Sequence, residues 1–211
     1  MLKKYFTIKQ SGSHEIVIQK SRFIGHVKRT ETEEEAQQFI QQIKKEHYNA
    51  THNCSAYMIG ERNQIQKAND DGEPSGTAGV PILEVLKKKD LKDTTVVVTR
   101  YFGGIKLGAG GLIRAYSKST SEAIDHIGVV ERLLMKHLKV TIDYTLLGKL
   151  ENELRSSDYL LSNIDYLENV AFHVHVEMDQ VEAFKDWIVE LTNAQAQIEA
   201  LEEDYIEIDV S

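Results

Sequence analysis

The chain has 211 residues, of which 41% are hydrophobic and 27% are charged, a composition typical of a globular protein with a core of its own. It contains no apolar segment long enough to span a membrane, no recognisable secretion signal and one cysteine, Cys54, which excludes an internal disulfide. These features predict a protein of the reducing cytoplasm without a membrane partner.

Charge is distributed unevenly along the chain, whose net charge is −8. Residues 1–130 carry 19 Lys and Arg against 15 Asp and Glu, whereas residues 131–211 carry 6 against 18. This break predicts two domains, 1–130 and 131–211, that face different partners. Two explanations of the acidic second domain stay open: contact with a partner protein, and simple solvation of its surface.

The first 130 residues alternate between strand and helix patterns. Thr32 followed by Glu35 forms a capping box, which predicts a helix from there to about His47. Three consecutive valines, Val96–Val98, predict a strand with both faces covered. The predicted elements are strands at 14–20, 22–29, 54–60, 64–68 and 94–101, and helices at 32–47, at 81–89 and from the glycine-rich segment to 127.

After Gly128 the pattern of elements begins again, so any linker there must be short. Strand patterns at 138–144, 160–166, 170–178 and 197–210 alternate with helix patterns at 146–156 and 181–191. The resulting order, βαββαβ, is that of a ferredoxin-like unit, and about eighty residues suit a small domain of this kind.

The segment from Thr99 to Thr120 contains five glycines within nine residues, between a buried strand and a helix. A helix start exposes backbone N–H groups and favours an anion. The glycine-rich segment is not a Walker loop, because Ala109 and Gly110 occupy the positions where lysine and serine or threonine are needed. It is not a dinucleotide-binding fingerprint either, because Ile113 occupies the position of the third glycine. Two explanations stay open: anion binding, and glycines that only permit tight packing or left-handed turns.

Basic residues flank this segment on both sides. Arg114 and Lys118 lie four positions apart, early in the predicted helix, where a cation opposes the positive end of the helix dipole. This placement favours a nearby phosphate, and we expect the cations to form one electropositive patch that binds RNA. The predicted phosphate-binding and nucleic-acid-binding residues are Arg100, Gly103, Gly104, Lys106, Gly108, Gly110, Gly111, Arg114 and Lys118.

Three segments together resemble the motifs of a known family. They are VVVTRYFGGIKLGAGGLIRAY at 96–116, DDGEPSGTAGVP at 70–81, and THNCSAY at 51–57, which contains His52 and Cys54. The chain resembles the IMPACT family, in particular its bacterial, YigZ-like members. The resemblance covers most of the first domain, and residues 131–211 are similar, less specifically, to the ferredoxin-like domain that many bacterial members carry.

The resemblance implies a fold and a field of activity. The first domain should share the two-layer α/β fold of the second domain of a small-subunit ribosomal protein, and the second should resemble domain V of elongation factor G. The chain is thus predicted to be an α+β protein. Eukaryotic members are translation regulators that bind an activator of a starvation-responsive kinase through protein contacts, and that partner is not implied for a chain with this bacterial-type second domain. We expect RNA or ribosome-associated factors as partners here.

Catalytic explanations have less support in the sequence. Cys54 could be a nucleophile near His52, but a single cysteine in a strand is typical of a small core residue. His52, Asp71 and Glu73 form a possible accessory site, and His173 and His175 alternate on a strand without complete metal-ligand spacing. We therefore expect no catalytic residue, cofactor or metal. The alternative is an enzyme that acts on a phosphorylated small molecule or nucleotide in the same crevice.

Overall fold

A computed structural model describes residues 1–210, whose contacts divide into two units. The first unit comprises residues 1–131 together with the chain end from residue 208, and the second comprises residues 132–207. That residues 1–130 and 131–211 fold independently of each other remains a prediction.

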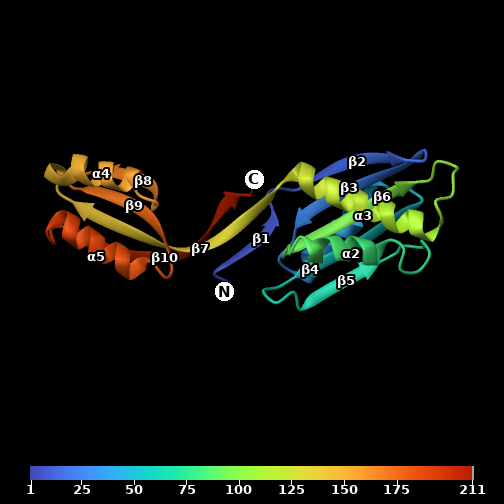
Figure 1. Cartoon of the computed structure of the whole chain (residues 1–211), viewed down its shortest axis with the longest axis horizontal. Coiled ribbons are helices and arrows are strands. Elements are labelled where there is room, and N and C mark those ends of the chain that lie inside the picture. The colour runs from blue at the N-terminus through green and yellow to red at the C-terminus, as the bar shows by residue number, and fades with distance from the viewer. Residues whose placement is uncertain (211) are drawn as a thin grey trace. The chain divides into compact units, whose positions relative to one another are not determined.

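The first unit is built on one antiparallel sheet with the strand order β2-β3-β6-β4-β5 (Figure 1). β6 is the central strand of this sheet. Its three valines, Val96–Val98, have no exposed surface, so both faces of the strand are covered. The strands are β2 (Gly12–Ile18), β3 (Ser21–Arg29), β4 (His52–Ile59), β5 (Ile65–Asn69) and β6 (Thr94–Tyr101).

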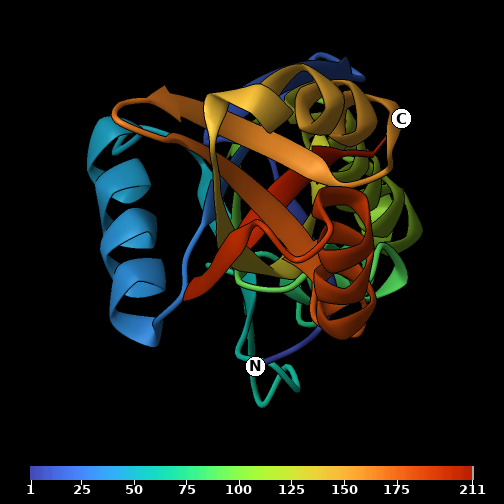
Figure 2. The same ribbon diagram turned by 90° about the vertical axis from the view of Figure 1, so that its left-hand side faces the viewer.

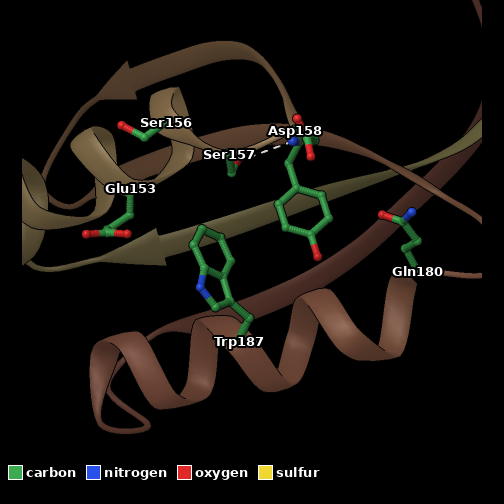
Figure 3. Close-up of a pocket in the computed structure, with 7 residues that line it drawn as sticks. Glu153, Ser156, Ser157, Asp158, Gln180 and Trp187 are labelled. Atoms are coloured by element: carbon green, nitrogen blue, oxygen red, sulfur yellow. Dashed lines mark hydrogen bonds between the residues drawn. The ribbon is translucent and has the colours of Figure 1, made fainter.

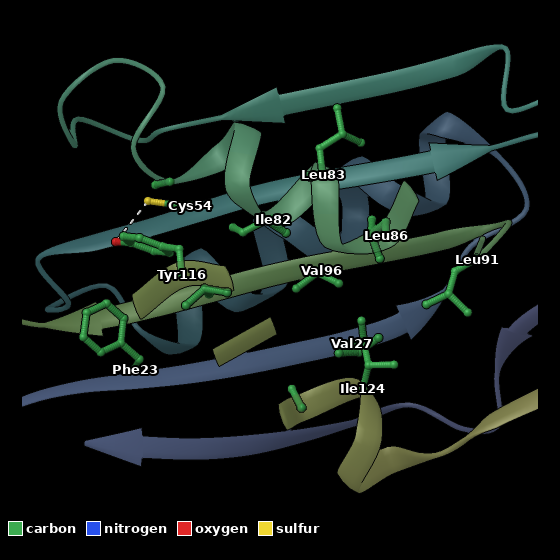
Figure 4. Close-up of a cluster of buried hydrophobic side chains, with 14 of the residues drawn as sticks. Phe23, Val27, Cys54, Ile82, Leu83, Leu86, Leu91, Val96, Tyr116 and Ile124 are labelled. Carbon is green, nitrogen blue, oxygen red and sulfur yellow. Dashed lines mark hydrogen bonds between the residues drawn. The ribbon is translucent and has the colours of Figure 1, made fainter. Parts of the chain in front are cut away.

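Helices cover both faces of this sheet. α2 (Gly79–Lys88) and α3 (Gly108–Ile127) pack on one face over the main core, which includes Val96 and Val98 (Figure 4). α1 (Glu33–Glu46) packs on the opposite face against Val97, and Figure 2 shows it on the far side of this unit from α2 and α3. The prediction that both faces of the valine strand are covered is confirmed, and α1 adds a layer to the expected two.

The Thr32 half of the capping box at the start of α1 forms as the sequence predicts. The backbone N–H of Glu35 donates to Thr32 Oγ1 at 3.2 Å, and Glu35 Oε2 accepts from the N–H of Glu31 at 2.8 Å. The first bond satisfies an N–H group that the helix leaves unpaired, whereas the Glu35 side chain bonds to Glu31, one residue before the Thr32 N–H that a capping box pairs. The apolar stripe of the helix, Ala36, Phe39, Ile40 and Ile43, is buried against the sheet.

The second unit has the βαββαβ order of a ferredoxin-like fold, as predicted. Its strands run in the order β10-β7-β9-β8. The two strands of each βαβ unit are therefore not adjacent: β9 lies between β7 and β8, and β7 lies between β9 and β10. Helices α4 and α5 pack on one face of this sheet, where Val170, Phe172 and Val174 of β9 are buried (Figures 1 and 2). The elements are β7 (Val129–Ile142), α4 (Leu147–Ser156), β8 (Leu160–Tyr166), β9 (Val170–Glu177), α5 (Val181–Thr192) and β10 (Gln197–Asp209).

Two features near the boundary differ from the sequence prediction. β7 begins at Val129 rather than 138, directly after Gly128, whose φ of 92° ends α3, so no separate linker exists. β1 (Lys4–Ile8), which is bonded to β7, was not predicted. It has only five residues, and a segment that short carries little periodic signal.

Candidate functional site

The glycine-rich segment divides into a loop and the first turn of α3. The loop follows β6 up to Leu107, and the helix begins at Gly108, so Gly110 and Gly111 are helical. Leu107 occupies the N-cap position, and its apolar side chain offers no capping oxygen. The first N–H groups of a 20-residue helix are therefore left for a ligand or water.

Three of the glycines have a structural role of their own. A Cβ at Gly103 would overlap the backbone of Lys20, and Gly103 also donates its N–H to Ser21 Oγ at 3.1 Å. Gly104 and Gly108 adopt φ values of 85° and 67°, in the left-handed region that favours glycine. Packing and turn geometry thus account for these three positions, whereas Gly110 and Gly111 have ordinary helical backbone.

A pocket of about 360 Å³ lies at the start of α3. Its polar lining consists of His52, Glu73, Arg100 and Lys106 together with Thr51, and Gly108 and Ala109 bring the helix start into it. Its apolar lining consists of Pro74, Phe102, Leu107 and Leu112. Of the predicted site residues, this pocket brings together Arg100, Lys106, Gly108, His52 and Glu73.

The floor of the pocket is a buried ion pair. Arg100 Nη1 donates to Glu73 Oε1 at 2.7 Å, and the hydroxyl of Tyr116 donates to the same oxygen at 2.8 Å. Arg100 and Glu73 are only 5% and 7% exposed, and the guanidinium lies near the rings of Phe23 and Phe102. Arg100 is therefore a buried, neutralised cation rather than part of a surface patch.

His52 stands between the ion pair and the turn that follows β5. Its Nδ1 lies 2.8 Å from the carbonyl oxygen of Asp71, and because a carbonyl only accepts, Nδ1 carries the hydrogen. Its Nε2 lies 3.7 Å from Glu73 Oε2. His52 Nε2 and Glu73 Oε2 thus face each other across the pocket, and within residues 1–210 neither atom forms a hydrogen bond.

The Asp71 carboxylate points elsewhere. Its oxygens accept from Lys44 Nζ at 2.6 Å and from the N–H of Asn53 at 2.7 Å. Burial raises the pKa of this carboxyl, but the bonds from Lys44 and Asn53 outweigh burial and lower the pKa below its ordinary value. Of the accessory set, Asp71 therefore contributes only its carbonyl oxygen to this region.

Asp70 organises the turn that follows β5, a segment whose Asp, Gly, Pro and Ser residues are typical of turns. Its carboxylate accepts the N–H groups of Gly76, Ala78 and Gly79 at 2.8, 3.1 and 2.8 Å. Burial raises the pKa of the Asp70 carboxyl, and these three bonds more than offset it, so the net pKa is lowered. Because Ala78 has no capping side chain, Asp70 supplies the cap of α2 from a distance.

Cys54 is fully buried, as predicted. Its thiol lies 3.0 Å from the carbonyl oxygen of Asp70 and 3.3 Å from the hydroxyl of Tyr116 (Figure 4). Burial raises the pKa of Cys54 to about 12, and burial together with Cys54 and Glu73 raises the pKa of Tyr116. Neither group is poised to ionise near neutral pH, which argues against a thiolate nucleophile.

Arg114 and Lys118 line a different hollow, on the outer side of α3. This hollow, of about 630 Å³, also includes Lys88, the last residue of α2, and Lys89, its C-cap. Among residues 1–210, Lys118 forms one ion pair, with Glu122 at 3.6 Å, and Arg114 forms none. The structure therefore does not gather the four predicted cations around one point: two line the pocket and two line this hollow.

The second unit has a hollow of its own, of about 390 Å³, between the end of α4 and the start of α5 (Figure 3). Trp187 projects from α5 toward α4, and the carboxylates of Glu153 and Asp158 line the same hollow. An aromatic face beside carboxylates suits a positively charged group.

Within residues 1–210, no group of three His, Cys, Asp or Glu side chains has the arrangement of a metal site. The same residues include no helix that combines the length and apolar character of a membrane span.

Comparisons with known proteins match both units. A family model described as the Impact N-terminal domain matches residues 19–124, and one described as a domain of unknown function (DUF1949) matches residues 140–195. A crystal structure described as that of a hypothetical protein is 30% identical with a TM-score of 0.61, covering 96% of this chain and 99% of that one.

Two bacterial relatives cover most of the chain, and a eukaryotic one covers less than half of it. The IMPACT family member YvyE of Bacillus subtilis is 66% identical over 207 residues, which is 98% of this chain and 95% of that protein. The IMPACT family member YigZ of Escherichia coli is 33% identical over 188 residues, 88% and 92% of the two chains. A Dictyostelium discoideum IMPACT homolog is 41% identical over 95 residues, 42% of this chain and 26% of that protein. The chain therefore belongs to the IMPACT family.

Proposed function

We propose that this protein is a non-enzymatic, cytoplasmic RNA-binding protein that acts on the translation apparatus. The observation that carries the proposal is the uncapped start of α3, which opens on a pocket lined by Lys106. Exposed N–H groups, the helix dipole and a lysine together favour a phosphate. The relation to eukaryotic IMPACT proteins, which regulate translation, supports translation as the field of activity.

The charges in the pocket also favour an anion. The Arg100–Glu73 pair is neutral as a unit, so Lys106 and the positive end of the α3 dipole set the sign of the potential. Arg114 and Lys118 on the outer side of α3 extend the positive charge along the helix, where further phosphates of one strand could be neutralised.

The test is the salt dependence of binding to a single-stranded RNA, measured by fluorescence anisotropy. Lys106→Gln should weaken binding and flatten the plot of log K against log salt by about one unit of slope. The matched control is Lys45→Gln, which removes an equal charge from an exposed position on α1. Equal slopes for the two variants, or no salt-dependent binding by the wild type, would contradict the proposal.

A second candidate function is supported by the pocket floor. His52 and Glu73 face each other beside Arg100, an arrangement that could handle a proton next to a phosphorylated small molecule or nucleotide. Turnover of a panel of nucleotides, abolished by His52→Gln, would favour this enzyme over a binding protein.

The acidic second unit is proposed to meet a protein partner. Its hollow beside Trp187 would take a lysine or arginine side chain of that partner, since carboxylates and an indole face both attract a cation.

A further inference from the structure

One oxygen on the pocket floor has no hydrogen-bond partner among residues 1–210. Glu73 Oε1 accepts from both Arg100 and Tyr116, whereas Oε2 has only His52 Nε2 at 3.7 Å, beyond hydrogen-bond distance. The Glu73 side chain is 97% buried and lines the pocket. Because Oε2 faces the pocket, it can accept a hydrogen bond from a donor of a bound ligand, and such a bond to a charged acceptor is favourable.

The partner of this oxygen must be a donor rather than a phosphate. A carboxylate accepts hydrogen bonds and repels another anion, so a phosphate belongs at the other side of the pocket, beside Lys106 and the start of α3. The ligand therefore carries an anionic group and a hydroxyl or N–H donor, and both groups fit in this one pocket.

The rest of the pocket fits an apolar ring. Phe102 is 46% exposed, so its ring is available, and Pro74, Leu107 and Leu112 complete an apolar wall. A pocket of about 360 Å³ is at the small end of the range for ligand sites, room for one nucleotide rather than a duplex. Unpaired bases are commonly bound on aromatic side chains in this way.

We infer that the pocket binds a single ribonucleotide unit, with its 2′-hydroxyl donating to Glu73 Oε2. The phosphate lies at the start of α3 beside Lys106, and the base lies against Phe102. In an RNA strand the 2′-hydroxyl is the ribose donor that remains free, because the 3′ oxygen is esterified. Glu73 is thus the residue that distinguishes RNA from DNA. This inference rests on the proposed function and deepens it.

The experiment compares ribose and deoxyribose ligands on the full chain. Calorimetric titration uses adenosine 5′-monophosphate, its 2′-deoxy counterpart and inorganic phosphate, and anisotropy uses one RNA strand and the DNA strand of equal sequence. A hydrogen bond to a charged acceptor predicts that each ribose ligand binds about tenfold or more tightly than its deoxy partner.

Two pocket variants and one control variant locate the effect. Glu73→Gln should reduce the preference for ribose to within about twofold, and Glu34→Gln, an exposed position on α1, should leave it unchanged. Because Glu73 also pairs with Arg100, its variant is checked by thermal unfolding, and Lys106→Gln serves as a second, exposed variant. It should weaken ribose and deoxyribose ligands equally.

The outcomes distinguish the ribonucleotide inference from the proposed RNA-binding function. Salt-dependent binding of RNA and DNA with equal affinity would overturn the ribonucleotide inference and leave the proposed function standing. Tight, ribose-selective binding of the mononucleotide without affinity for RNA strands would support the inference and overturn the proposed function. Absence of binding to every one of these probes would overturn both.

Discussion

At the scale of single residues, the pocket depends on the Arg100–Glu73 pair. The two residues are 27 positions apart and both are nearly buried, so each neutralises a charge that would otherwise stand uncompensated in the core. The sequence shows that Arg100 and Glu73 belong to separate motifs, but not that they pair, because the contact depends on where the turn folds over the sheet.

Replacing Arg100 should show this dependence. Arg100→Met leaves the Glu73 carboxylate buried without its cation, and we expect a loss of about 3–5 kcal/mol in the free energy of unfolding in urea. The double variant Arg100→Met with Glu73→Gln should recover part of that loss, since no buried charge remains. A loss below about 1 kcal/mol in the single variant would contradict the buried pair.

His26 makes the stability depend on pH. Burial and the neighbouring His47 lower the pKa of His26 from 6.5 to about 4. The unfolded chain therefore takes up a proton before the folded one, so stability is full above pH 6.5 and is lost as the pH falls to about 4. The expected loss is up to about 3 kcal/mol.

The measurement is urea unfolding between pH 4 and pH 7, the range set by this pKa shift. His26→Leu should have a flatter pH profile than the wild type, whereas His14→Leu, at a less buried histidine of β2, should keep the wild-type slope. Equal slopes in wild type and His26→Leu would show that another group titrates.

At the scale of elements, the Asp70 turn joins β5 to α2. One carboxylate satisfies three backbone N–H groups, including those at the start of the helix. The run of Asn, Asp, Gly, Pro and Ser residues at 69–79 is typical of a turn, and the sequence predicts most element boundaries within a few residues. It does not predict which aspartate caps the helix, because Asp70 and Asp71 are adjacent and equivalent in type.

Removing this carboxylate should loosen the turn. Asp70→Ala leaves the N–H groups of Gly76, Ala78 and Gly79 without an acceptor, at a cost of about 2–4 kcal/mol. Relative to the wild type, the rate of hydrogen exchange at these three amides should increase much more than the rate at amides of β9. The control is Asp186→Ala, at an exposed position on α5. Unchanged exchange at all three amides would refute the capping role.

At the scale of the whole molecule, the change in charge along the sequence and the boundary between the two units coincide near residue 131. The sequence could not show that β7 crosses this boundary without a loop, nor that the chain end from residue 208 returns to the first unit. Strand pairing between distant segments leaves no mark in local periodicity. Lys9 and Asp209, for example, form an ion pair at 2.7 Å across 200 positions.

Truncation tests whether the units are domains. A fragment of residues 1–131 keeps the core over α2 and α3, so we expect one cooperative urea transition. Its midpoint should be lower than that of the full chain, because the fragment lacks two contacts of the chain end. These are the ion pair of Asp209 with Lys9 and the hydrogen bond that the Val210 N–H donates to the Val129 carbonyl. A gradual, non-cooperative transition would show that residues 1–131 do not fold alone.

Binding of RNA at the start of α3 can be tested with an ultraviolet crosslinking map of RNA on the native protein in cell extract. Crosslinked peptides should include the segment 100–112, where Phe102 and Lys106 line the pocket, and Lys106→Gln should reduce those crosslinks. Crosslinks confined to residues 132–207, or none above background, would contradict it.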